Sequence, residues 1–211
     1  MEIEKLADSL INKSGGKPSF KMVDGYKYAT CVNVNAGVVH GIPKKEIVFK
    51  DGDIVSVDVG IFYKGFHTDT SISVLLGKDD EKSHFLDIGK SALKKAIKQA
   101  KRGKRIWHIS QAMEKAIVQA GFYPVRSLVG HGVGRSLHEE PQIPCFIYGK
   151  PENTPKIVEG MVFAIEAMYT QTDTSLVVEE DGWTIVTSDG KISGLFEETI
   201  AVTKNGPLVI T

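Results

Sequence analysis

The sequence predicts an α+β fold in which antiparallel strands are flanked by helices. Stretches with strand-like alternation and stretches with helical periodicity are mixed, without the regular strand–helix–strand rhythm of a parallel sheet. One pattern also occurs twice: residues 51–58 and 159–166 each begin with an acid and a glycine, alternate apolar residues and end in a carboxylate. The 211 residues can enclose one well-buried core. We therefore expect one domain over residues 1–211, made of two pseudo-symmetric halves at about 1–105 and 106–211.

Two helices are predicted between the repeated patterns. Residues 84–101 place apolar side chains on one face and five lysines elsewhere, which is typical of an amphipathic helix with a solvated face. Residues 106–119 carry an apolar stripe that includes Met113, which we interpret as core. This second helix should stop at Gly121, because glycine commonly follows a helix end and Pro124 lies just beyond.

Strands are predicted where apolar and polar residues alternate. These stretches are 54–62 with 66–75, then 162–169, and finally 183–202 with a break at 188–190. A two-residue turn at Tyr63-Lys64 would place Asp58 directly opposite Asp69. Like charges at that distance on a half-buried sheet are destabilising unless something offsets them, and a bound cation is the simplest offset.

Composition excludes several function classes. Lys plus Arg and Asp plus Glu both total 26, so no net charge attracts nucleic acid or an anionic membrane. Cys31 and Cys145 lack the spacing of a zinc or redox motif, and no cleavable apolar leader precedes them. The apolar runs are too short to cross a bilayer. We expect a soluble, cytoplasmic protein.

Acidic residues and one histidine suggest a metal site. Besides Asp58 and Asp69, the repeated pattern indicates Glu166, and Glu197 or Glu198 offers a fourth carboxylate; a weaker repeat of 65–69 at 194–198 favours Glu198. His131, between two glycines, adds the nitrogen ligand that transition metals prefer. Four carboxylates balance the charge of two divalent cations. Such pairs generate a bridging hydroxide at neutral pH, so hydrolysis is the expected reaction.

Seven motifs occur in order along the chain: residues 35–43 (NAGVVHGIP), 51–58 (DGDIVSVD), 65–70 (GFHTDT), 130–134 (GHGVG), 137–141 (LHEEP), 162–166 (VFAIE) and 196–199 (FEET). With these motifs the chain resembles the type I methionine aminopeptidases, which have the two-metal pita-bread fold. The resemblance extends over nearly the whole chain. It implies a metallo-exopeptidase that removes the initiator methionine from nascent proteins by attack of a metal-bridging hydroxide.

The resemblance also implies a role for each metal ligand. Asp58 would chelate one metal, Asp69 and Glu197 would bridge both, and His131 with Glu166 would bind the other. The family pattern thus selects Glu197 where the weaker repeat favours Glu198. The ions would be Mn, Fe, Co or Zn. The implied partners are the N-terminal methionine of nascent chains and, as a candidate, the ribosome, with a monomeric enzyme acting away from membranes and nucleic acid.

Further residues are assigned by the same resemblance. His138 would hydrogen-bond the substrate near the scissile amide, His40 would orient the substrate and stabilise the transition state, and Glu166 would transfer the proton of the attacking water. The methionine side chain would occupy a pocket formed by Tyr26, Cys31, Leu137 and Trp183.

The chain departs from the family pattern at two positions. Ala167 stands where the family has proline, and Glu198 where it has histidine, which places an extra acid beside the metal bridge. Either difference can alter metal affinity without abolishing the chemistry.

Two other functions fit part of the pattern. An aminopeptidase or dipeptidase for proline-containing peptides would use the same metal ligands, but residues 40–43 have the methionine aminopeptidase form. A non-catalytic pita-bread binding module would usually lose ligands, whereas all five positions are occupied here, and the neutral net charge gives no nucleic-acid footprint.

Overall fold

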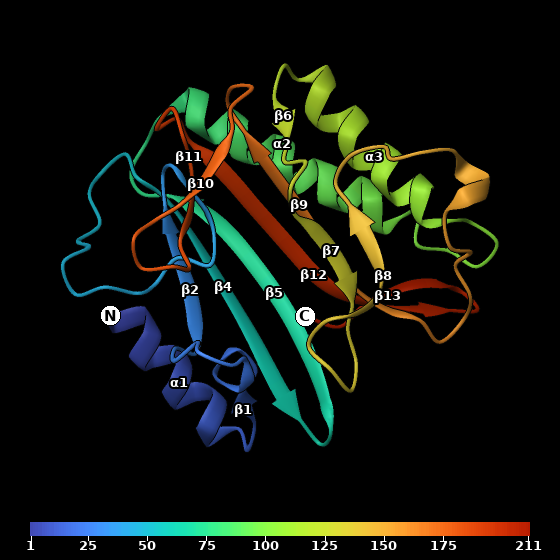
Figure 1. The fold of residues 1–211 in the computed structure, drawn as a ribbon, viewed down its shortest axis with the longest axis horizontal. Coiled ribbons are helices and arrows are strands. Elements are labelled where there is room, and N and C mark those ends of the chain that lie inside the picture. The colour runs from blue at the N-terminus through green and yellow to red at the C-terminus, as the bar shows by residue number, and fades with distance from the viewer.

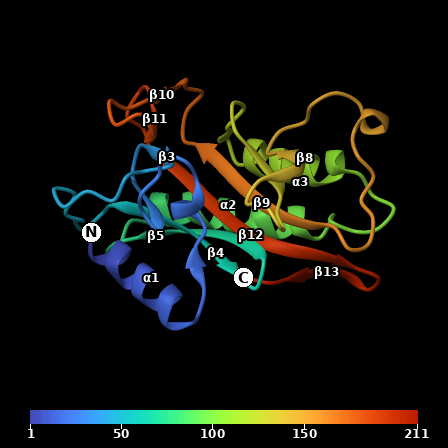
Figure 2. The same ribbon diagram turned by 60° about the horizontal axis from the view of Figure 1, so that its bottom comes forward.

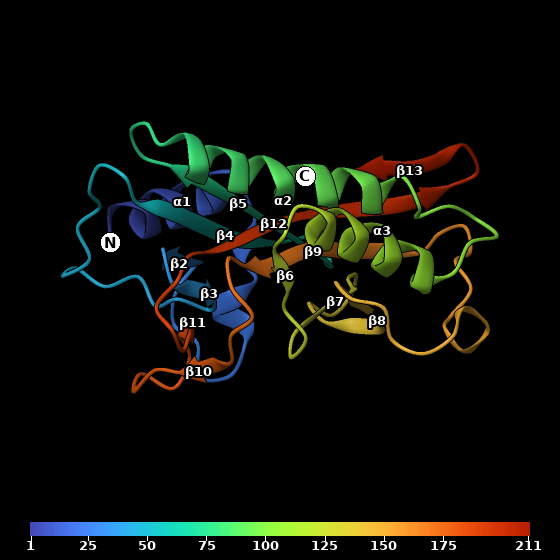
Figure 3. The same ribbon diagram turned by 90° about the horizontal axis from the view of Figure 1, so that it is seen from above.

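A computed structural model describes all residues, 1–211, as a curved antiparallel sheet with three helices on one side (Figures 1 and 3). The helices are α1 (Glu2–Lys13), α2 (Asp80–Ile97) and α3 (Ile106–Gln119), and two 3-10 turns are η1 (Phe20–Met22) and η2 (Pro151–Asn153). The mixture of helices with antiparallel strands confirms the predicted fold class. No helix is long and apolar enough to span a membrane.

Ten strands form the main sheet. Its central order is β1-β4-β5-β12-β9-β7-β8, while β2 pairs with β4, β6 with β9 and β13 with β12. Their bounds are β1 (Lys17–Pro18), β2 (Thr30–Val34), β4 (Ile54–Tyr63), β5 (Phe66–Leu75), β6 (Tyr123–Pro124), β7 (Val129–Gly132), β8 (Glu139–Pro144), β9 (Val162–Thr170), β12 (Ser193–Thr203) and β13 (Gly206–Val209). The four longest strands thus lie side by side at the centre, two from each part of the chain. The division into related halves stays a prediction.

A second, small sheet stands over one end of the main sheet, on the side opposite α1 (Figures 2 and 3). Its strands, in spatial order, are β10 (Leu176–Val178), β11 (Ile185–Thr187) and β3 (Gly37–Val39). The break predicted at 188–190 separates β11 from β12, and Gly190 there has a φ of +71°. The strand predicted from residue 183 begins at Ile185, because Trp183 and Thr184 bond instead to Asp181.

The predicted register of the β4–β5 hairpin is wrong, because the two turn residues lie one position later in the chain than Tyr63-Lys64. Its turn residues are Lys64 and Gly65, with φ of +48° and +90°, which is the geometry of a tight hairpin turn with glycine second. Asp58 therefore lies opposite Ser71, and Asp69 lies opposite Gly60. The two acids are diagonal neighbours, and such positions are about 7–8 Å apart, which leaves room for an ion between the carboxylates.

The two predicted helices are present, but both boundaries of the first one differ. Helix α3 has the predicted bounds, whereas α2 begins at Asp80, four residues before the predicted residue 84, and ends at Ile97, four residues before the predicted residue 101. The Asp79 side chain accepts a hydrogen bond from the Lys82 N–H, which caps the helix start. The prediction missed this cap because the first turn of α2 is charged and carries no apolar periodicity.

The main core lies between α2, α3 and the sheet, and comprises 27 buried residues. Gly89 allows close packing, because a Cβ there would lie 2.6 Å from both Phe196 and Tyr169. The Tyr169 hydroxyl donates to the Phe85 carbonyl oxygen over 2.6 Å, which ties β9 to α2. This packed layer supports β9 and β12 from behind, so their opposite faces are free to carry polar groups.

Candidate active site

The predicted metal ligands lie on the face of the main sheet that points away from the helices, and they form two adjacent rows. The strand register gives the members of the first row as Cys31, Asp58, Ser71, Glu197 and Glu166, on β2, β4, β5, β12 and β9. The second row comprises Gly60, Asp69, Thr199, Ala164 and His131. Because side chains alternate between the faces of a strand, each row presents all its side chains on one face.

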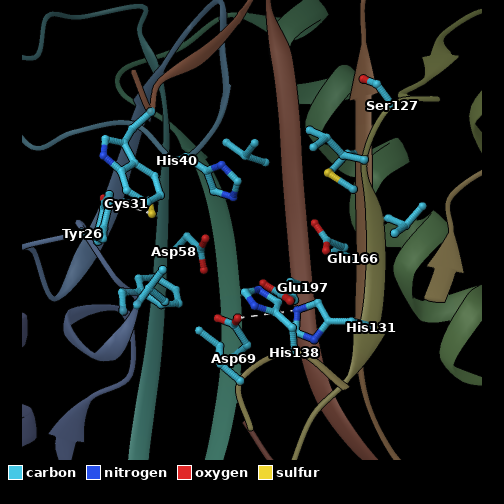
Figure 4. Close-up of a pocket in the computed structure, with 18 residues that line it drawn as sticks. Tyr26, Cys31, His40, Asp58, Asp69, Ser127, His131, His138, Glu166 and Glu197 are labelled. Carbon is cyan, nitrogen blue, oxygen red and sulfur yellow. Dashed lines mark hydrogen bonds and ion pairs between the residues drawn. The ribbon is translucent and has the colours of Figure 1, made fainter. Parts of the chain in front are cut away.

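Asp69, His131 and Glu197 converge most closely. One ligand atom from each lies within 4.8 Å of the others, and all three residues are buried. The Asp69 Oδ2 atom is 3.9 Å from His131 Nε2 (Figure 4). The Asp69 backbone N–H donates to the Thr199 hydroxyl over 2.8 Å, and this hydroxyl donates to the Asp69 carbonyl oxygen over 2.7 Å, so β5 and β12 are held together at the ligands.

The carboxylates are uncompensated by protein charge. No lysine or arginine is among the 18 residues that line the pocket above them. Burial raises the pKa of Asp69 to about 7, and burial with the nearby Asp69 charge raises the pKa of Glu166 to about 8. The pKa values of Asp58 and Glu197 are raised well above their usual range for the same reasons. The cluster therefore favours bound protons or bound cations.

The donor set fits divalent metal ions. Asp58 Oδ1 is buried and has no hydrogen-bond partner, which leaves an oxygen free for coordination. Carboxylate oxygens with one imidazole nitrogen suit first-row transition metals.

His131 is prepared to act as a ligand. Its Nδ1 lies 2.8 Å from the Gly132 carbonyl oxygen, to which it can only donate, so Nε2 faces Asp69 with a free lone pair. Burial lowers the pKa of His131 to about 4, which keeps the ring neutral at pH 7. The glycines beside it are required by packing: a Cβ at Gly130 would lie 2.7 Å from the Ala164 carbonyl oxygen.

Glu197 and Glu198 point to opposite faces of β12. Glu197 is 4% exposed and lies in the first row, between Ser71 and Glu166. Glu198 accepts a hydrogen bond from the Thr211 hydroxyl over 2.8 Å, on the other face. The weaker sequence repeat, which favours Glu198, thus misplaces this acid by one residue.

The acidic cluster lines one side of a cavity of about 320 Å³, and the remaining wall of this cavity forms a mainly apolar pocket (Figure 4). All four residues predicted for it line its wall: Tyr26, Cys31, Leu137 and Trp183. The Tyr26 and Trp183 rings meet edge to face with centroids 5.0 Å apart. The Tyr26 hydroxyl donates to the Thr30 carbonyl oxygen over 2.9 Å, and burial raises the pKa of the Cys31 thiol, so neither group is ionised at pH 7.

His40 and His138 face the same cavity from different loops (Figure 4). His40 follows β3 with a φ of +58°, a left-handed conformation that is uncommon for a non-glycine residue. His138 lies between β7 and β8, in a loop held by a 2.7 Å bond from the His67 N–H to the Gly134 carbonyl oxygen. The pKa of each imidazole is lowered, chiefly by partial burial, so both are mainly neutral at pH 7. A neutral imidazole can donate one N–H to a substrate.

Several pocket residues were not predicted from the sequence. They are Phe20, Val23, Val39, Ser127, Leu128, Val129 and Met168. Met168 could have been found, because it follows Glu166 by two positions and so lies on the same face of β9. The others lie in loops, in the 3-10 turn η1 and in short strands, none of which has a periodic signal.

Comparison with known proteins places the chain in a family. The model of metallopeptidase family M24 matches residues 1–204. A methionine aminopeptidase 1 of Bacillus subtilis is 41% identical over 100% of this chain and 84% of its own length. The chain belongs to the methionine aminopeptidases of family M24. A methionine aminopeptidase of Clostridium perfringens is 39% identical, with the same shares covered.

Solved structures show that this M24 member shares the pita-bread fold. The methionine aminopeptidase of Thermotoga maritima has a TM-score of 0.95 and 45% identity, and the match covers 99% of this chain and 83% of that one. A dipeptidase from Pyrococcus horikoshii is also similar, with a TM-score of 0.73, but at 23% identity over 51% of its length it shows the fold alone.

Proposed function

We propose that the protein is a metal-dependent aminopeptidase that removes the N-terminal methionine from nascent polypeptides. One observation carries the proposal: four carboxylates, three of them buried, and one neutral histidine line the same cavity as a wall of apolar and aromatic residues, and no lysine or arginine lines it. Methionine aminopeptidases are the relatives that match the whole chain.

Two divalent cations, of Mn, Fe, Co or Zn, match the charge of the cluster. Asp58 would bind one ion, Asp69 and Glu197 would bridge both, and His131 with Glu166 would bind the other. The position of Asp69 and Glu197 on the two central strands supports the bridging role, since each has ligands on both sides. When bound, such a pair of cations activates water and polarises a carbonyl group.

The protein's own groups would move protons and orient the substrate. Glu166 lines the cavity beside the cluster, where its carboxylate would accept the water proton and later deliver it to the leaving nitrogen. His138 would donate to the oxygen on which negative charge develops. His40, on the opposite wall, would orient the substrate.

The pocket favours an unbranched apolar side chain. Phe20, Tyr26, Cys31 and Leu137 form a small buried cluster of their own, against which Trp183 packs. Methionine is flexible and polarizable, and fills irregular apolar gaps well. A charged side chain would find no partner on this wall.

An assay of metal content and peptide cleavage tests the proposal. We expect the purified protein to bind divalent cations and to cleave Met-Ala-Ser, leaving Ala-Pro-Ala intact. Cleavage of Ala-Pro-Ala alone would favour the proline-specific alternative. Absence of metal binding under all conditions would contradict the proposal.

A further inference from the structure

Ser71 occupies the middle of the first ligand row without carrying a charge. Its partners in register are Asp58 on β4 and Glu197 on β12, so all three side chains lie on the same face of the sheet. Directly opposite side chains on antiparallel strands have Cβ atoms about 4.5–5.5 Å apart. The Ser71 hydroxyl is therefore adjacent to both carboxylates.

The Ser71 hydroxyl has no hydrogen-bond partner although the residue is only 6% exposed. On the neighbouring strand, Asp58 Oδ1 is also buried and without a partner. A buried donor and a buried acceptor that both lack partners thus lie in register. Buried polar groups in proteins are nearly always hydrogen-bonded. We therefore expect a small local rearrangement that brings the Ser71 hydroxyl and Asp58 Oδ1 into a hydrogen bond.

Ser73 provides an internal comparison, because it lies two residues further along β5 on the same face. The Ser73 hydroxyl donates to the Leu195 carbonyl oxygen over 2.8 Å, accepts from the Leu195 N–H over 3.0 Å and lies 2.6 Å from the Ser56 hydroxyl. Ser73 therefore connects β5 to β12, as a structural serine does. Ser71 makes none of these connections and does not hold the strands together.

We propose that Ser71 is a positioning residue for the metal site. When cations draw the carboxylates together, the Ser71 hydroxyl donates a hydrogen bond to the Asp58 carboxylate and fixes it in the orientation that binds metal. The inference rests on the proposed function, in which Asp58 is a ligand. Groups that hydrogen-bond to metal ligands typically change metal affinity by about 10- to 100-fold when they are removed.

The test compares Ser71→Ala with Ser73→Ala, using Mn²⁺ titration of the metal-free protein by calorimetry and thermal unfolding of the same samples. We expect Ser71→Ala to weaken Mn²⁺ binding by about 10- to 100-fold. Its metal-free Tm should stay equal or rise, because alanine leaves no unpaired hydroxyl. Ser73→Ala should show the reverse, with a lower metal-free Tm and wild-type Mn²⁺ affinity. Ser71→Thr, which keeps the hydroxyl, should restore affinity.

Three outcomes would overturn the inference: wild-type Mn²⁺ affinity in Ser71→Ala, a parallel loss of affinity and metal-free stability, or failure of Ser71→Ala to fold. The last two would show a structural role. If the wild-type protein itself bound neither Mn²⁺ nor Co²⁺, the proposed function would fail instead, so the two failures are distinguishable.

Discussion

The metal cluster and the apolar pocket adjoin each other but are built in different ways. The cluster is carried by the central strands of the main sheet, where each of β5 and β12 has neighbours on both sides. The pocket wall comes partly from the main sheet, through Cys31 on β2 and Met168 on β9, but also from loops and from the small sheet, which carries His40 directly after β3 and Trp183 two residues before β11. Strand register therefore fixes the positions of the acidic side chains. The loops can vary without disturbing that register, and they shape the part of the pocket that would select the substrate's side chain.

The largest expected effect lies at the centre of the cluster. Asp69→Ala or Glu197→Ala should abolish hydrolysis and lower metal content, because three carboxylates cannot hold two cations close together. Glu198→Ala is the matched control, since its side chain points to the other face of β12 and should leave metal content unchanged. Metal analysis and a Met-Ala-Ser assay measure both. Loss of metal in Glu198→Ala with retention in Glu197→Ala would show that the ligand assignment is wrong.

The two histidines at the boundary between cluster and pocket should behave differently, although their rings are only 4.5 Å apart. His138→Ala should lower kcat by about 10²- to 10³-fold with metal content unchanged, because it removes one donor to the transition state. His131→Ala should lose metal as well as activity. Equal metal loss in both variants, or a near-normal kcat in His138→Ala, would remove His138 from the proposed catalytic groups.

Changes in the pocket should affect substrate binding and leave the metals in place. Trp183→Ala removes the ring that packs edge to face on Tyr26 and should lower kcat/KM for Met-initiated peptides by roughly 10- to 200-fold, the usual range for lost apolar contacts in a pocket. Wild-type protein should discriminate strongly against Lys-initiated peptides. Equal turnover of the two peptides, measured as kcat/KM, would contradict the assigned pocket.

The smallest expected effect is on the stability of the metal-free protein. The folded-state pKa values of Asp69 and Glu166 are about 7 and about 8, against ordinary values of 3.8 and 4.5, so the fold binds these protons more tightly than the unfolded chain does. Their contribution to stability is present below pH about 4 and is lost as the pH rises to about 8. The Tm of chelator-treated protein should therefore be lower at pH 8 than at pH 5, and Mn²⁺ should restore it at pH 8.

Asp69→Asn is the control for this effect, since an amide does not titrate. It should reduce the difference in Tm between pH 5 and pH 8. A higher Tm of the metal-free wild type at pH 8 than at pH 5 would contradict the prediction. It would show that groups other than bound protons offset the negative charge of the cluster.

The sequence was sufficient for the long central elements, because periodicity is strongest there. The bounds of α3 and β5 and the positions of the paired acids followed from alternation and repeats. The hairpin register did not, because it depends on which residues of the turn adopt a positive φ. With Gly65 in the second turn position, the partner of every residue moves by two, so that Asp58 pairs with Ser71 and not with Asp69. Periodicity alone does not tell which of the adjacent acids Glu197 and Glu198 faces the cluster. That assignment required the family pattern.

The pocket was predictable only where a motif or the family resemblance marked it. Tyr26 and Trp183 are 157 positions apart in sequence and meet only because the small sheet stands over the loop before β2. No local pattern encodes such a contact. Phe20 was missed for the same reason, and Ser71 was missed because an uncharged side chain gives no signal within an acidic row.

The location of the ligand rows on central strands also has a consequence for hydrogen exchange. The backbone amides of β5 and β12 beside the ligands are bonded within the sheet and can exchange with solvent only when the whole layer opens. Gly41 shares this protection, because its carbonyl oxygen accepts from the Val32 N–H of β2 over 2.8 Å and its N–H donates to Asn33 Oδ1 over 2.9 Å. Residues 42–44 are held instead to the neighbouring loop, by the 3.1 Å bond from the Ile42 N–H to Thr184 and by the ion pairs of Lys44 with Asp181 and Glu179. Opening these contacts exposes the Ile42 and Lys44 amides without disturbing the sheet. The part of this loop beyond Gly41 can thus open many times for each occasion on which the ligand rows come apart.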